Sequence, residues 1–141
     1  GADISAEALE VAKINRSRYG MDETLELIQS DIFSQLGKRR FDLIISNPPY
    51  VTQEAMDMLP GEYRHEPALA LEAGEDGMDF MRRFMPALKD HLTEDGLAVV
   101  EIGDGREAFE AIWPDLPVTW LATEEEEDMI FAVHARDLKD L

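Results

Sequence analysis

The hydrophobic and polar positions divide the chain into short helices and strands that follow one another. Segment 6–19 has apolar residues on one helical face, with Ser5 as a plausible N-cap and Gly20 as a C-terminal cap. Segments 77–92 and 106–113 also show helical spacing, and Pro114 stops the second. The apolar runs and alternations typical of strands occupy segments 24–29, 41–46, 96–102, 118–123 and 129–135.

Strands that alternate with helices predict an α/β fold with a parallel, doubly wound sheet. The last two strands follow each other without a helix, so we expect an antiparallel hairpin at the edge of that sheet. The acidic run between them, residues 124–128, is expected to be a solvated turn rather than a binding site. Residues 50–76 show no clean periodicity, and so long a connection in a small domain indicates a functional loop or lid.

Composition excludes several classes of protein. The chain has 141 residues, 45% of them hydrophobic, which suits one domain with a real core. Its formal net charge of −18 argues against a duplex nucleic-acid binder, because phosphate contacts need a basic face. With no cysteine and three isolated histidines, we expect no metal site. No membrane span or signal pattern is evident, so a cytoplasmic protein is expected.

The tetrapeptide Asn47-Pro48-Pro49-Tyr50 is the strongest candidate for chemistry, because it directly follows a predicted buried strand. Ligands of open α/β sheets bind at the carboxyl ends of the strands. The Asn47 side-chain carbonyl and the Pro48 backbone carbonyl could accept the two N–H groups of a planar amino group. The Tyr50 ring could stack on the flat face of the target. The alternative, a Pro-Pro turn that merely ends a strand, is less consistent with the long loop that follows.

Two aspartates follow other predicted strands. An acidic residue at the end of the second strand of a nucleotide-binding sheet typically holds ribose hydroxyls. Asp3 could have this role, although it could equally cap the helix after it. Asp31 could accept from an adenine amino group, with Ile32 or Phe33 packed near the base. The alternative is that Ser30-Asp31 is an ordinary N-cap.

Taken together, these elements resemble class I S-adenosylmethionine-dependent methyltransferases, whose fold is a Rossmann-like sheet. The resemblance implies S-adenosyl-L-methionine as the cofactor, bound by Asp3, Asp31 and the residues after it, and Asn47. It implies a catalytic role for Asn47, Pro48 and Tyr50. Two branches share the Asn-Pro-Pro-Tyr form: adenine-N6 nucleic-acid methyltransferases and protein glutamine-N5 methyltransferases.

The loop favours the glutamine branch. Glu62-Tyr63-Arg64-His65-Glu66-Pro67, followed by Gly74-x-Asp76-Gly77, is similar to the form found in enzymes that modify a large-subunit ribosomal protein. The release-factor enzymes usually carry a shorter form. The resemblance therefore implies a protein substrate bound by the tetrapeptide 47–50 together with Arg64, His65 and Glu66, although Arg64 and His65 could instead pin the loop. An acidic enzyme would also be steered towards a basic ribosomal protein, whereas a halophilic source would equally explain the charge.

The chain departs from this family at its start. Gly1-Ala2-Asp3 looks like the end of a strand, and the family's glycine-rich first motif and N-terminal substrate-recognition domain have no counterpart. We therefore expect residues 1–141 to form a partial catalytic domain that binds the cofactor weakly on its own and pairs with a second copy through an exposed sheet edge. A truncated, non-catalytic module is the remaining alternative.

Other residues have simpler explanations. We expect Glu101 to bond to backbone at the end of its strand rather than to face the cofactor. Met78 to Met85 and the two tryptophans, Trp113 and Trp120, should pack in or over the core.

Overall fold

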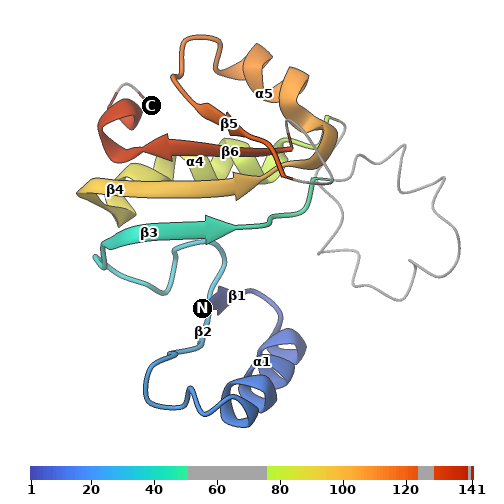
Figure 1. Cartoon of the computed structure of the whole chain (residues 1–141), viewed down its shortest axis with the longest axis vertical. Coiled ribbons are helices and arrows are strands. Elements are labelled where there is room, and N and C mark those ends of the chain that lie inside the picture. The colour runs from blue at the N-terminus through green and yellow to red at the C-terminus, as the bar shows by residue number, and fades with distance from the viewer. Residues whose placement is uncertain (51–75, 124–128, 140) are drawn as a thin grey trace, which may run out of the picture. The chain divides into compact units, whose positions relative to one another are not determined.

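The structure is a computed structural model that describes residues 1–50, 76–123, 129–139 and 141. It consists of two compact units, Gly1–Arg39 and Arg40–Leu141, each of which is described by itself (Figure 1). The predicted loop 50–76, apart from its ends, and the acidic run 124–128 lie outside the described residues. Within the described part of the chain, no helix is both long enough and apolar enough to cross a membrane.

The first unit contains one helix and one pair of very short strands. Helix α1 (Ala6–Arg18) begins after Ser5, whose hydroxyl oxygen accepts the Ala8 N–H at 3.1 Å. Gly20 has the left-handed φ of +66° that the predicted C-terminal cap requires. Strands β1 (Ala2–Asp3) and β2 (Ile28–Gln29) pair in parallel. The helix and both caps are therefore confirmed.

The strand predicted over 24–29 is too long. The N–H groups of Thr24 and Leu25 both donate to the Met21 carbonyl, so these residues form a turn and cannot join a strand ladder. Only Ile28 and Gln29 pair with β1.

The second unit contains a four-stranded sheet in the order β3-β4-β6-β5 (Figure 1). Strand β3 (Phe41–Ser46) pairs in parallel with β4 (Leu92–Glu101). Strands β6 (Ile130–His134) and β5 (Thr119–Leu121) continue the sheet with antiparallel pairing. The predicted hairpin is thus confirmed. The described residues of this unit also form the helices α4 (Asp79–His91) and α5 (Arg106–Ile112) and the short 3₁₀ turns η2 (Gly103–Gly105) and η3 (Ala135–Leu138).

Strand β4 begins at Leu92, four residues before the predicted start at Gly96. Leu92 pairs with Phe41, and the Thr93 hydroxyl donates to the Asp42 carboxylate at 2.8 Å. The register then shifts before Leu43 pairs with Leu97. Residues 93–96, whose composition is typical of a turn, therefore form an irregular stretch of the strand.

One face of this sheet is closed. Ala98, Val100, Phe131 and Val133 alternate with less buried residues and are at most 1% exposed. Phe131 contacts Phe109 of α5, with 4.6 Å between the ring centroids. The buried side of α4 adds Met81, Phe84, Met85 and Leu88, and Figure 1 shows α4 behind β4 and β6. We call this the covered face, and it confirms that the methionines pack in the core.

The opposite face is apolar but much more exposed. Leu43 and Ile45 of β3 are 52% and 75% exposed. Their register partners on β4, Leu97 and Val99, are half-buried and lie on the same face. We call the side defined by these four residues the open face, and it ends at Glu101, the next residue of β4 with the same orientation.

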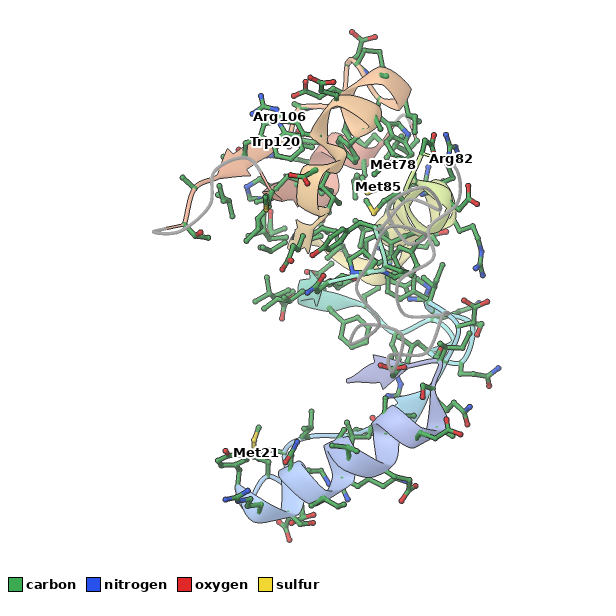
Figure 2. All side chains as sticks on the ribbon, turned by 90° about the vertical axis from the view of Figure 1, so that its right-hand side faces the viewer. Met21, Met78, Arg82, Met85, Arg106 and Trp120 are labelled. Carbon is green, nitrogen blue, oxygen red and sulfur yellow. The ribbon has the colours of Figure 1, made fainter. Side chains whose placement is uncertain are left out.

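The two tryptophans cover the edge of the core, as predicted. The rings of Trp113 and Trp120 lie 4.9 and 6.0 Å from the Phe109 ring, between centroids. The Arg106 guanidinium sits 4.7 Å above the Trp120 ring, and Figure 2 shows the two side chains together. This contact holds the first residue of α5 against strand β5.

Candidate active site

The tetrapeptide leaves the sheet at the carboxyl end of β3. Ser46, the last residue of β3, is the register partner of Val100 on β4. Because the two strands are parallel, the residues after Ser46 and after Val100 emerge at the same edge of the sheet. Asn47 is exposed and Pro48 is buried, while Pro49 and Tyr50 are half-buried. The tetrapeptide thus combines an exposed Asn47 with a buried Pro48 at the carboxyl end of β3.

Tyr50 contacts Glu101, the last residue of β4, and Gly103, which lies just after this strand. Its hydroxyl donates a hydrogen bond to the Glu101 carboxylate, with 3.1 Å between the oxygens. The edge of its ring lies directly over Gly103, so that a Cβ at Gly103 would come within 2.5 Å of the ring carbon Cε2. Gly103 also has a left-handed φ of +52°. The position thus requires glycine both for its backbone conformation and for the space that the ring occupies.

The expected role of Glu101 was therefore incomplete. We predicted a strand-end carboxylate bonded to backbone, and the structure shows it accepting from the side chain of Tyr50 instead. The prediction considered only neighbours close in sequence, whereas Tyr50 lies 51 residues away. Gly103 was not predicted at all. The only signal was a glycine immediately after an apolar strand, and this pattern alone does not identify its partner.

The far end of the long loop is anchored at the start of α4. Both Arg82 terminal nitrogens donate to the Asp76 carboxylate, one of them at 2.8 Å, and the same carboxylate accepts the Met78 N–H at 3.0 Å. The pKa of Asp76 is lowered to about 2, mainly by the hydrogen bond from Arg82. Gly77 follows with a φ of +74°. Asp76 and Gly77 of the loop motif therefore lie just before α4, and Figure 2 shows Arg82 of this helix near Met78 and Met85.

In the first unit, Asp3 ends β1 and its side chain is partly used locally. One carboxylate oxygen accepts the Ser5 N–H at 2.8 Å, so the alternative of a helix-capping role has direct support. The residue is exposed, however, and the bond fixes the orientation of the carboxylate. A fixed, exposed carboxylate is the acceptor that a pair of ribose hydroxyls needs.

The segment after β2 is strained. Ile32 has a φ of +51°, which is unfavourable for a β-branched residue. The buried Ser30 holds this turn, because its hydroxyl donates to the Ile32 carbonyl at 2.9 Å and accepts the Gln35 N–H at 3.1 Å. The turn leaves Asp31 exposed and Ile32 and Phe33 half-buried. A carboxylate beside two partly accessible apolar side chains fits the amino edge and the face of an adenine.

The remaining predicted binding residues, Arg64, His65 and Glu66, lie outside the described residues. Over the described ranges, no three histidine or acidic side chains are grouped so as to hold a metal ion. A surface hollow is present in the second unit, but its lining includes Arg40, Leu92 and Asp95. These residues lie at the amino ends of β3 and β4, opposite the tetrapeptide, so the hollow does not belong to this site.

Residues 1–62 match the family model described as the methyltransferase small domain. Among curated proteins, the chain is 48% identical to the ribosomal protein uL3 glutamine methyltransferase of Bordetella pertussis over 96% of the chain and 46% of that protein. It is also 48% identical to the same enzyme of Bradyrhizobium diazoefficiens, over 96% of the chain and 43% of that protein. The chain spans about half the length of the curated relatives it matches.

Solved structures agree on the fold. The ribosomal protein L11 methylase of Lactobacillus delbrueckii subsp. bulgaricus matches with a TM-score of 0.58 and 17% identity, over 94% of this chain and 54% of that one. An rRNA methylase of Streptococcus thermophilus matches with a TM-score of 0.54 and 15% identity, over 94% and 69%. The fold, the placement of the tetrapeptide and the sequence relatives agree. Over the part of the chain that the structure describes, the fold is that of the solved methylases, and the sequence is similar to proteins named glutamine methyltransferases.

Proposed function

We propose that this chain carries part of the catalytic domain of an enzyme that methylates the N5 nitrogen of a glutamine side chain. The proposed substrate is a protein of the large ribosomal subunit. The observation that carries the proposal is the tetrapeptide at the end of β3, with Asn47 exposed, Pro48 buried and Tyr50 fixed by Glu101. Sequence relatives named as uL3 glutamine methyltransferases support the choice of substrate.

The proposed roles follow from the chemistry of an amide nitrogen. Its lone pair is delocalised into the carbonyl, which makes it a poor nucleophile. The Asn47 side-chain oxygen and the Pro48 carbonyl oxygen would accept its two N–H groups, orient the nitrogen and stabilise the positive charge that develops there. The Tyr50 ring would stack on the plane of the amide. Bound S-adenosyl-L-methionine supplies the methyl group, and the proton leaves to solvent after transfer.

The proposed cofactor residues lie in the first unit. Asp3 would accept the ribose hydroxyls and Asp31 the adenine amino group, with Ile32 and Phe33 against the base. Asn47 would also border the cofactor, as a contact secondary to its bond with the target amide. The support is the exposure of both carboxylates and the strained turn at Ile32. We expect the 141-residue chain to bind the cofactor more weakly than a polypeptide that extends this sequence to the length of the relatives, hereafter the extended polypeptide. Calorimetry on both, and on Asp31→Ala, measures this.

The net charge of −18 supports a basic protein substrate rather than direct binding of nucleic acid. A ribosomal protein would be met in the cytoplasm before assembly, so we place the protein there.

We further propose that two copies of the 141-residue chain associate through β3. This strand pairs on one side only within the described sheet, and Leu43 and Ile45 next to that edge are exposed. Sedimentation of the chain should show a dimer or larger species, and Ile45→Lys should weaken the association. A compact monomer at high concentration contradicts this part of the proposal.

Asn47→Ala in the extended polypeptide tests the catalytic assignment. Loss of one positioned polar group at a reacting centre typically lowers turnover by about a hundred- to a thousandfold. We expect that loss in methyl transfer to the ribosomal protein, with little change in cofactor affinity. Gln35→Ala, which removes an exposed amide elsewhere, is the control. Near-normal turnover of Asn47→Ala would mean that the tetrapeptide does not hold the target amide.

A further inference from the structure

We infer that Glu101, the last residue of β4, and Gly103, two residues further along the chain, are positioning residues that set the orientation of Tyr50 for the substrate. This inference rests on the proposed function, because it assigns to the two residues a part in holding the target amide. Tyr50 follows β3, whereas Glu101 ends the neighbouring strand β4 and Gly103 begins the turn η2 after it. The register of β3 and β4 brings these distant segments to one edge of the sheet.

Among the described residues, a hydrogen bond and a close contact position the ring. The hydroxyl is fixed by the bond to the Glu101 carboxylate, at 3.1 Å. The ring edge is fixed by Gly103, where an added Cβ would lie 2.5 Å from Cε2 and 2.6 Å from Cδ2. A bond at one end of an aromatic ring and a close contact along its edge together restrict both side-chain torsions. The ring is then pre-organised before substrate binds, which reduces the entropic cost of binding.

The location of Glu101 on the sheet explains why this residue can act in this way. It has the same orientation as Leu97 and Val99, on the open face, and its exposure is intermediate rather than buried. The next residue, Ile102, is fully buried and its N–H donates to the Met129 carbonyl at 2.8 Å. The carboxylate therefore projects from a backbone that is fixed by the core, so its position is well defined.

This arrangement changes the expectation for Tyr50→Phe. If stacking were the only role of the ring, this variant should keep most of its activity. Because the hydroxyl bonds to a carboxylate, we instead expect Tyr50→Phe and Glu101→Ala to lower kcat/KM for the protein substrate by similar factors. Loss of one hydrogen bond to a charged group corresponds to about ten- to a hundredfold. Glu101→Gln retains an acceptor oxygen and should restore most of the activity.

A double-mutant cycle in the extended polypeptide separates this role from simple loss of structure. If Glu101 acts through the Tyr50 hydroxyl, Tyr50→Phe combined with Glu101→Ala should be no worse than either single variant. The KM for the cofactor should not change. Glu94→Ala, an exposed glutamate of the same strand, is the control and should behave as wild type. Losses that multiply in the double variant would show that the two residues act independently and would overturn the inference.

A structural readout on the 141-residue chain decides the question even if methyl transfer to glutamine is not observed. Nuclear Overhauser contacts between the Tyr50 ring protons and the Gly103 Hα should be present in the wild type and in Glu101→Gln. They should weaken or vanish in Glu101→Ala, and Gly103→Ala should shift the ring resonances. Unchanged contacts and ring resonances in Glu101→Ala would overturn the inference. An inactive wild-type extended polypeptide with the contacts intact would instead contradict only the proposed function.

Discussion

The covered and open faces of the four-stranded sheet are both apolar and share strand β4, but they differ in how far their side chains are buried. Val100 and Phe131 on the covered face are fully buried by α5 and the core, whereas Ile45 on the open face is 75% exposed. Stability therefore resides on one face. The candidate site lies at the end of the other, because Glu101 has the orientation of the open-face residues and bonds to Tyr50.

Phe131→Ala should have the largest effect on folding. The ring is fully buried between Phe109 and Trp120, so its removal leaves a cavity and should cost about 3–5 kcal/mol of unfolding free energy. Ile45→Ala on the open face should cost less than about 1 kcal/mol, since that side chain is mostly exposed already. Urea denaturation of both variants measures the difference. Equal losses would show that the open face is buried in solution.

Arg106→Ala should lower the free energy of unfolding by a smaller amount. The guanidinium covers the Trp120 ring and also pairs with Glu110 at 2.9 Å, on the partly exposed rim of the covered face. Loss of a contact of this kind typically costs about 0.5–1 kcal/mol. We expect a modest fall in the denaturation midpoint and a change in tryptophan fluorescence. A loss of unfolding free energy as large as that of Phe131→Ala would show that Arg106 and Trp120 are part of the buried core.

The smallest expected effect on stability is that of the exposed ion pair between Arg82 of α4 and Asp76, and it depends on pH. Hydrogen bonding from Arg82 lowers the pKa of Asp76 to about 2, below its value in an unfolded chain of about 3.9. Its contribution to stability is therefore present above about pH 4 and is lost as the pH falls towards 2. Because the pair is exposed, the contribution should be less than about 1 kcal/mol. The difference in stability between wild type and Asp76→Asn should shrink across that range, and a difference independent of pH would contradict this assignment.

Local signals in the sequence predicted most of the secondary structure. The helix caps at Ser5 and Gly20, the boundaries of β3 and the final hairpin depend on residues close in sequence, and each is confirmed. The early start of β4 was missed because Thr93 to Gly96 has the composition of a turn. Only pairing with Phe41 and Asp42 draws these residues into the sheet.

The candidate site was predictable only in part. The tetrapeptide could be placed because it directly follows a strand whose apolar pattern is clear. Its link to Glu101 and Gly103 could not, because it depends on the parallel register of two strands separated by about fifty residues. The two faces could not be distinguished either, because the continuous apolar runs of β3 and β4 place apolar residues on both faces of the sheet.

Transfer of a labelled methyl group by the extended polypeptide, followed by mass mapping of the product, tests the central claim most directly. Labelled S-adenosyl-L-methionine would be offered with a purified large-subunit ribosomal protein in one reaction and with adenine-containing DNA or RNA in another. The account predicts one methyl group on a glutamine side chain of the ribosomal protein, strongly reduced by Asn47→Ala and unaffected by Gln35→Ala. Label on adenine, or on a protein residue other than glutamine, would contradict it.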